Sequence, residues 1–517
     1  MSHALARGLL SAALLTPATT FAADDAEIAE LRTMLNQMKN DYERRIADLE
    51  ARLERAERAA SQPPPTAPMP AESLPMAAPV VHAAPQSPPT GGLGALTSGT
   101  AFNPQISVIL DGNYYHDGID GRGATLVGEA FRPGRTLHAH EEETDSAHAH
   151  GMTGNGFNLR SAEIAFSATV DPYFDAFTYL AIDGDGNVDL EEAYFRTRSL
   201  PYGLKAKGGK FLSDFGYINR QHPHQWDFVD QNLPYLNLLG DHGLQDTGLQ
   251  LTWLPELPFY ALLGVEALQG DQEVFGATLS ETEQVELSLG DTEDGPRLWT
   301  AFAKVAPELP DNHALQLGIS YAHADQHQAV LAHEHATEAE GDEVGAHEDA
   351  QAPDIEPHET GLAGDAALWG IDLVYKYSGD GPHGQGDLVF QTEYLRLIQD
   401  LQVRASPHPE DIGARPSFTT DGLYAQATYG FAPKWTAGLR YDVLGLTTNQ
   451  VRDTLSEDFG SSDRWTLALT WNLSEFSRLR AQYARNDILV EPGERERFDA
   501  FYLQFLMSLG AHGAHPF

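Results

Sequence analysis

Histidine pairs set beside carboxylates are the residues of this sequence best suited to chemistry. The chain of 517 residues holds 21 His, and several stand two apart with Glu and Asp nearby. The candidate metal ligands are His138, His140, His148, His150, His222, His224, His323, His327, His333, His335, His347 and His358. Imidazole with carboxylate suits Zn, Cu, Ni or Co, and His-x-His pairs bind such ions without a preformed cage. The alternative is a set of solvated acidic loops in which the histidines are incidental.

The composition excludes other kinds of chemistry and some partners. The absence of Cys removes thiol catalysis, Cys-based zinc sites and disulfides. The formal net charge of -42 repels nucleic acid and draws cations. No spacing of a nucleophile and a base stands out among the many Ser, His and Asp residues, so we expect no enzyme. We expect no required cofactor, only zinc or another divalent transition metal held loosely by loops.

The C-terminal stretch 498–509 indicates the kind of element that must position these residues. Large apolar side chains occupy alternate positions there: Phe501, Leu503, Phe505, Met507 and Leu509. A strand so apolar on one face is an aggregation hazard in water unless it closes against another strand in a barrel. No apolar run of eighteen or more residues follows the N-terminus, which excludes a helical membrane protein. The terminal Phe517 resembles the aromatic ending of bacterial outer-membrane barrels, which implies recognition by the barrel-assembly machinery.

The same alternation, with turn chemistry between, predicts an all-β transmembrane barrel of about 16 antiparallel strands. The predicted strands lie near 105–114, 157–168, 174–183, 188–198, 203–211, 245–254, 258–267, 297–305, 314–323, 367–376, 387–397, 422–430, 435–444, 464–472, 477–486 and 498–509. The second and fourth strands do not keep a clean period, so bulges are expected there.

Connector length predicts the orientation of the barrel. Short turns alternate with long connectors at 115–156, 212–244, 268–296, 324–366, 398–421, 445–463 and 487–497. Outer-membrane barrels place short turns in the periplasm and long loops outside, so the histidine clusters are expected on the extracellular side. Whether the connector 212–244 folds inward decides the width of the constriction.

The first hundred residues are predicted to be a targeting signal and two extended segments. Residues 1–23 read as a signal peptide, 24–60 as an α-helical coiled coil, 61–100 as a Pro-rich linker and 101–517 as the barrel. A single amphipathic helix is the alternative for 24–60. We expect the coiled coil to lie in the periplasm, to support a homotrimer, and to be able to reach the cell wall.

Part of the barrel sequence resembles a known family. The segments 157–163, 189–194, 204–211 and 215–216 are similar to the phosphate-selective porin O/P family. That resemblance implies a sixteen-stranded trimeric outer-membrane channel that selects anions with cationic side chains in its lumen. The C-terminus and the His-rich loops also resemble proteobacterial proteins described as zinc-regulated outer-membrane receptors.

Strand parity gives the side chains expected to line the lumen. They are Lys205, Lys207, Arg440, Asp442, Arg478 and Arg480. Because the acidic excess of the chain lies in the long loops, the field at the mouth should favour cations even above a basic constriction. We therefore do not expect this protein to share the phosphate selectivity of that family.

These patterns predict a porin in the outer membrane of a Gram-negative bacterium, surrounded by outer-membrane lipid. It would pass small solutes or ions passively, with His- and acid-rich loops that collect metals such as zinc. A zinc-regulated metal receptor is one alternative, although energised receptors have about 22 strands and a plug, and no plug-sized domain precedes the first predicted strand. A barrel-anchored envelope tether, with a closed lumen, is the other.

Overall fold

The computed structural model describes residues 104–135, 154–334, 357–447, 449–452 and 455–510. Every described residue belongs to one compact unit, Gly91–Phe517. The predicted signal peptide, coiled coil and Pro-rich linker lie outside the described residues, as does Phe517.

The strands follow one another along the chain with only short helices between them. They are β1 (Gln105–Asp117), β2 (Gly156–Thr169), β3 (Phe174–Ile182), β4 (Val188–Thr197), β5 (Leu204–Leu212), β6 (Gln245–Trp253), β7 (Tyr260–Leu268), β8 (Leu298–Ala306), β9 (His313–Glu334), β10 (Pro357–Tyr377), β11 (Leu388–Ala405), β12 (Pro416–Ala432), β13 (Trp435–Leu444), β14 (Asn449–Arg452), β15 (Leu455–Asp458), β16 (Ser462–Ser474), β17 (Ser477–Glu491) and β18 (Glu494–Gly510). The helices are α2 (Gly123–Gly128), α3 (Leu233–Leu239) and α4 (Glu281–Glu286), with 3-10 turns η2 (Pro201–Gly203), η3 (Pro223–Gln225), η4 (Pro382–Gly384) and η5 (Pro409–Asp411). No helix in the described part of the chain is both long and apolar enough to cross a membrane.

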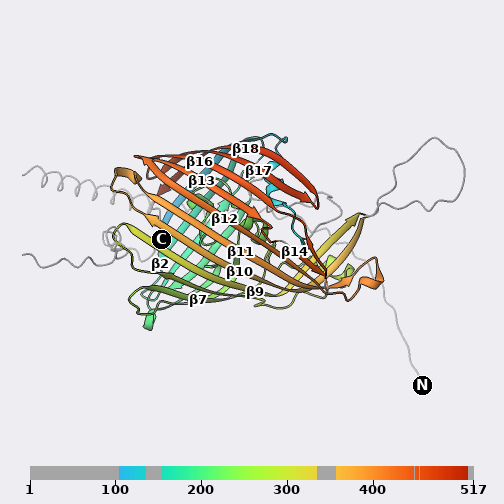
Figure 1. The fold of residues 1–517 in the computed structure, drawn as a ribbon. Helices are drawn as coiled ribbons and strands as arrows, with labels where there is room; N and C mark the ends of the chain where they lie inside the picture. The colour runs from blue at the N-terminus through green and yellow to red at the C-terminus, as the bar shows by residue number, and fades with distance from the viewer. Residues whose placement is uncertain (1–103, 136–153, 335–356, 448, 453–454, 511–517) are drawn as a thin grey trace, which may run out of the picture. The chain divides into compact units, whose positions relative to one another are not determined.

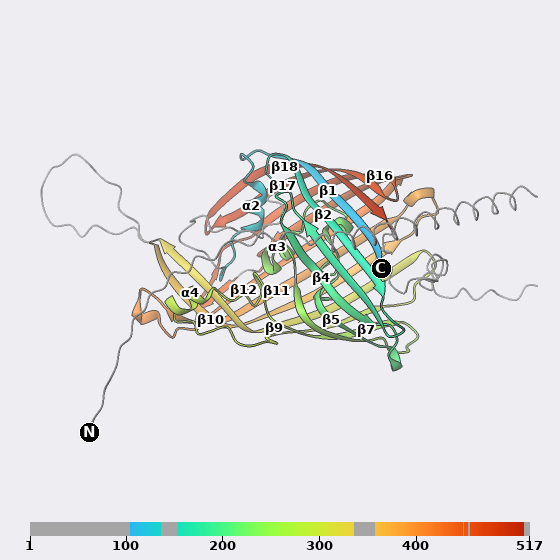
Figure 2. The same cartoon turned by 180° about the vertical axis from the view of Figure 1, so that it is seen from behind.

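The sheet closes on itself because its first and last strands pair. β1 is antiparallel to both β2 and β18, and each other wall strand pairs with its neighbours (Figure 1, Figure 2). β14 and β15 form a side hairpin against β12, while β13 pairs directly with β16. Within the described residues the remaining sixteen strands form a closed antiparallel barrel, which confirms the predicted fold class.

The two faces of the wall differ as the alternation predicts. On β16, Trp465, Leu467 and Leu469 are exposed, whereas Thr466 between them is fully buried. β18 repeats this pattern, with Phe501, Leu503 and Phe505 outside and Tyr502 and Gln504 inside. An outward apolar band of this kind belongs against lipid chains, since in water it would be a large exposed apolar patch. The protein is thus a transmembrane barrel.

Most strand limits agree with the sequence prediction, but the connector predicted at 487–497 is wrong. β17 continues to Glu491 and β18 begins at Glu494, so only residues 492–493 form the turn. Arg495 and Arg497 pair with Asp487 across this hairpin at 2.6 and 2.8 Å. The start of β18 is charged on both faces, while β17 continues through the buried Ile488 and Leu489, so the ladder extends past the point where the sequence alternation stops. β9 and β10 also extend into the connector predicted at 324–366, where Ala329, Val330 and Leu362 are buried.

Candidate functional site

The connector between β5 and β6, residues 213–244, fills much of the barrel interior and is called here the lumen segment. Asp241 is its one exposed residue. Its two ends are tied together, because the Ser213 amide donates to the Leu244 carbonyl at 2.9 Å. Its helix α3 lies within the ring of strands in Figure 2 and contacts β11, β12 and β13.

The main hydrophobic core of the molecule lies inside the barrel, around the lumen segment. The segment contributes Phe215, Ile218, Trp226, Val229, Leu233, Tyr235, Leu238 and Leu239 to this core. The wall contributes inward side chains from many strands, among them Tyr115, Leu298, Leu368, Leu395, Tyr424, Ile488, Phe498 and Tyr502. A single connector is therefore packed against most of the inner wall.

Local sequence explains the path of the segment. Asn232 caps α3, since its side chain accepts a hydrogen bond from the Tyr235 amide, and Pro234 in the first turn favours the helical φ angle. The helix ends at Gly240, whose φ of 89° lies in the left-handed region. Gly216 also has positive φ, and a Cβ there would stand 2.1 Å from the Tyr235 hydroxyl oxygen, so a larger residue would break this packing.

Charged side chains of the wall hold the segment through a buried network. Asp230 of the segment pairs with Arg440 at 2.7 Å and with Arg464 at 2.8 Å, and Asp442 contacts both guanidiniums. Burial opposes ionisation of Asp230, but Arg464 and Arg440 outweigh it and lower the pKa of this carboxyl to about 2. The predicted lumen residues Arg440 and Asp442 therefore lie within an anchor for the segment.

Other wall cations donate to backbone carbonyls of the segment. Arg480 donates to the Trp226 carbonyl at 3.0 Å, and Arg478 donates to the His224 carbonyl. Lys205 is exposed. Lys207 is half-buried, with its ammonium 4.3 Å from the centre of the Phe211 ring. Of the six predicted lumen residues, four thus contribute to anchoring the segment, and Lys207 also attracts Asp214 of the segment.

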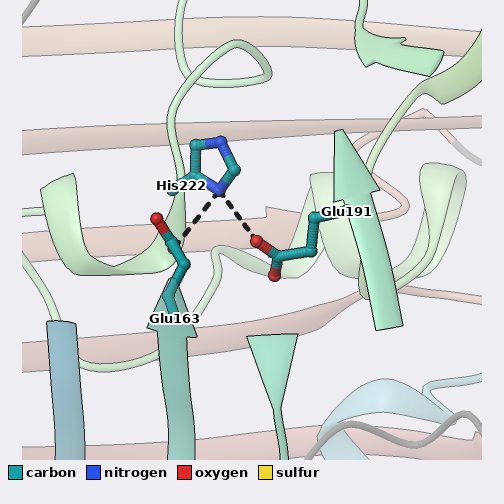
Figure 3. A group of neighbouring side chains, drawn as sticks. All are labelled: Glu163, Glu191 and His222. Carbon is teal, nitrogen blue, oxygen red and sulfur yellow. Dashed lines mark hydrogen bonds and ion pairs between the residues drawn. The ribbon is translucent and has the colours of Figure 1, made fainter. Parts of the chain in front are cut away.

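A concentrated set of titratable groups lies where the segment meets β2 and β4 (Figure 3). His222 Nδ1 is 3.1 Å from a Glu191 oxygen and 3.5 Å from a Glu163 oxygen. The same Glu163 oxygen lies 3.1 Å from His224 Nδ1, and the other ring nitrogen of His222 lies 2.8 Å from Glu192. These five residues form the histidine–glutamate cluster.

A β-bulge brings two consecutive carboxylates of β4 into the cluster. Tyr179 on β3 stands opposite Glu192 and Leu180 stands opposite Leu190, so Glu191 is an extra residue in the ladder. In a regular strand, neighbouring side chains point to opposite faces, and a bulge removes that constraint. Glu191 and Glu192 can therefore both reach His222. The irregular period predicted for this strand has this cause.

The cluster is well packed and strongly acidic around its imidazoles. Tyr179 stacks on the His222 ring at 4.7 Å between centroids, and the two imidazoles stack at 5.7 Å. Burial opposes a charge on His222, but the carboxylates of Glu163, Glu191 and Glu192 outweigh it and raise its pKa well above the usual range. The arrangement can hold either a proton or a metal cation between imidazole and carboxylates.

The remaining predicted metal ligands lie elsewhere. His323 is partly exposed, and its Nε2 atom lies 3.3 Å from an Asp325 carboxylate oxygen. His327 is buried, and its Nε2 atom lies 2.6 Å from the side-chain nitrogen of Gln399. His333 and His358 occupy opposite backbone positions of the β9–β10 ladder. Outside the described residues lie His138, His140, His148, His150, His335 and His347.

Sequence reasoning found His222 and His224 but missed their three carboxylate partners. Glu163 is 59 residues before His222 in the chain, and no spacing rule links them. The signal that could have found Glu191 and Glu192 is the consecutive pair itself, because two adjacent carboxylates break the alternation of a wall strand.

The solved structures to which the chain is similar include outer-membrane proteins. No family model matches the chain, so the resemblance to the phosphate-selective porin O/P family is not confirmed. Among solved structures, the chain is similar to in-vitro folded OmpT, an outer membrane protein of Vibrio cholerae, with 11% identity, 80% of this chain and 99% of that chain covered, and a TM-score of 0.41. It is also similar to the outer membrane channel DcaP of Acinetobacter baumannii, with 12% identity, 79% and 96% covered, and a TM-score of 0.41. An anion-selective porin from Comamonas acidovorans has 11% identity, 79% and 99% covered, and a TM-score of 0.41.

An uncharacterized protein of Aquifex aeolicus (strain VF5) is 34% identical over 421 residues, which cover 81% of this chain and 80% of the Aquifex protein. The chain belongs to the same family as this Aquifex protein.

Proposed function

We propose that the protein is an outer-membrane channel of the porin type, through which small solutes or ions diffuse. The observation that carries this proposal is the closed barrel in the described part of the chain, with its apolar outer face and charged inner wall. Closure pairs the backbone groups within the wall, which is what a lipid bilayer requires of a β-structure. Such barrels occur in the outer membranes of Gram-negative bacteria, where we place this protein.

The lumen segment is the constriction of the proposed channel. It crosses the interior and is held by side chains on opposite parts of the wall, among them Glu266 on β7, Glu393 on β11 and Arg480 on β17. Because it buries an apolar core inside the barrel, the path left for solutes is narrow. We therefore expect small ionic steps and exclusion of larger solutes.

The acidic excess of the chain supports a preference for cations over anions. Arg440 and Arg464 on the wall are paired with Asp230 and Asp442, so these cations are neutralised locally. The acidic excess of the chain, with a formal net charge of -42, then dominates the long-range field. Cation preference is accordingly part of the proposal.

Two further parts of the proposal rest on residues outside the described ones. The paired-helix spacing of 24–60 supports a homotrimer with a periplasmic coiled coil that can reach the cell wall. The pairs His138/His140 and His148/His150 support loose collection of transition metals at the mouth. Replacing 138–150 by a Gly-Ser segment should lower the number of weak zinc sites without changing conductance. Undiminished weak binding would remove this loop from the proposal.

The channel is tested by electrical measurement in a planar bilayer formed from defined lipid. With purified protein and a salt gradient, the reversal potential should have the sign of cation flux. Anion preference would overturn the selectivity, and absence of any conductance would overturn the channel and leave the barrel-anchored tether as its replacement. Heat-modifiable mobility on a gel is the control for folding.

A further inference from the structure

The histidine–glutamate cluster has the donors of a transition-metal site. It offers two imidazole nitrogens and carboxylate oxygens, a set that suits zinc and other borderline divalent ions. His222, His224 and Glu163 are buried, with exposed fractions of 6, 7 and 4%. Their positions are fixed by packing, unlike those of histidines on a solvated loop.

The spacing of three of the donors is near that of tetrahedral coordination. Zinc binds nitrogen and oxygen ligands at about 2.0 to 2.2 Å, so two ligands of a tetrahedral site lie about 3.4 Å apart. In the cluster, His222 Nδ1 lies 3.1 Å from Glu191 and 3.5 Å from Glu163, and His224 Nδ1 lies 3.1 Å from Glu163. The ligand atoms of Glu163, Glu191 and His222 all lie within 4.8 Å of one another. The His224 Nδ1 atom contacts Glu163 but is not among these mutually close atoms, so its ring must move toward Glu191 for four ligands to surround one ion.

Glu192 supplies the outer partner that such sites require. A metal-bound histidine usually donates a hydrogen bond from its second ring nitrogen to a carboxylate. This bond fixes the orientation of the ring and raises its basicity. The His222 Nε2 atom lies 2.8 Å from Glu192, while its Nδ1 atom faces Glu191 and Glu163. The bulge in β4 therefore gives one carboxylate to each ring nitrogen.

An acidic cavity borders the cluster at Glu191. A cavity of about 370 Å³ lies beside Glu191, where the connectors before β6 and after β7 approach the start of β4. Its carboxylates are Asp189, Glu191, Asp246, Asp271 and Glu273. Negative charge in a partly enclosed cleft concentrates cations.

We propose that His222, His224, Glu163 and Glu191 bind one divalent transition-metal ion, with Glu192 orienting His222. The ion links the lumen segment, through η3, to β2 and β4 of the wall. Metal binding therefore fixes the segment at one side of the barrel. The metal site deepens the proposed function and rests on it: bound metal affects conductance only if the segment is the constriction.

Metal titration of the folded protein in detergent tests the site directly. After treatment with EDTA and buffer exchange, calorimetry with zinc should show one tight site above the weak background of the loops. Co²⁺ at the same site should give the intense visible bands of a tetrahedral complex. The double change His222→Ala with His224→Ala should weaken the tight binding at least 100-fold and abolish these bands.

Matched variants separate ligands from neighbours. Glu192→Gln should weaken zinc binding about 10- to 100-fold and keep the tetrahedral cobalt spectrum, as expected for an outer partner. His323→Gln, which removes a histidine paired with Asp325, should leave the tight site unchanged. If the double histidine variant does not fold, Glu163→Gln and Glu191→Gln replace it.

Tight binding that survives loss of both histidines, or a wild-type protein with only weak background binding, would overturn the site. Binding without a tetrahedral cobalt spectrum would also overturn it. Because no bilayer is used, a protein that binds zinc tightly but conducts no ions overturns the channel and leaves the site standing.

Discussion

Glu393 on β11 and Tyr217 in the lumen segment are 176 residues apart in sequence, yet the Tyr217 amide donates to the Glu393 carboxylate at 2.8 Å. The same carboxylate accepts from the Ile218 amide at 3.0 Å and from the hydroxyls of Tyr235 and Tyr424 at 2.8 and 2.5 Å. One buried carboxylate therefore holds the start of the lumen segment and its helix together against the wall.

Changing Glu393 to Gln should loosen the lumen segment without opening the barrel wall. The amide cannot accept from all four donors, and loss of bonds to a charged acceptor costs about 2 to 3 kcal/mol. We expect faster protease cleavage within 213–244 and noisier single-channel currents. Asp499→Asn on the outer side of β18 is the control, because Asp499 is exposed and contacts Arg485 and Tyr483. Equal protease sensitivity of the two variants would contradict the anchor.

The anchor at Asp230 should fail in strong acid. Its folded-state pKa of about 2 lies below the ordinary value of about 3.9, so its stabilising effect is complete above pH 4 and is lost as the pH falls through 2. Cross-linking or protease protection of the segment should therefore fall between pH 4 and pH 2. Asp230→Asn should remove this step of the acid titration. An unchanged acid profile in that variant would assign the transition to other groups.

The apolar band can be tested with one pair of substitutions to Arg. Leu467 in the middle of β16 and Leu446 after β13 have similar exposed fractions, 56 and 53%. Leu467→Arg should destabilise the barrel in lipid by about 2 to 4 kcal/mol, because it places a charge near the middle of the bilayer. Leu446→Arg should have little effect, since it lies beyond the strand end. Urea unfolding of the protein in vesicles measures both, and equal losses would mean that the band is misplaced.

Deleting residues 24–60 should weaken self-association without preventing insertion, if this stretch is the predicted coiled coil. Cross-linking and native mass measurement in detergent would follow the oligomer, and heat-modifiable mobility would follow the barrel. A deletion variant that no longer inserts would instead make the stretch part of the folding unit.

The barrel could be predicted because its signal repeats in most wall strands. Along β16, Trp465, Leu467 and Leu469 alternate with inward residues. Because successive side chains of a strand point to opposite faces, this alternation also indicates where a strand begins and ends. The prediction failed where that period is lost, as at the consecutive apolar residues Ile488 and Leu489 of β17 and at the charged start of β18 around Arg495.

The interior could not be predicted in the same way. The lumen segment has no period, and the partners of Tyr217 and Asp230 lie on strands far along the chain. The spacing of His222 and His224 predicts metal ligands, but Glu163, Glu191 and Glu192 reach them only through barrel closure and the bulge of β4. Residue type indicated the chemistry of the cluster, while its partners depend on tertiary geometry.

The central claim is that the lumen segment constricts an ion channel. Single-channel conductance of the full-length protein should be compared with that of a variant in which residues 220–239 are replaced by a short Gly-Ser linker. We expect small cation-preferring steps for the intact chain and several-fold larger steps for the variant. Absence of conductance in both folded proteins, or identical steps in both, would contradict this account.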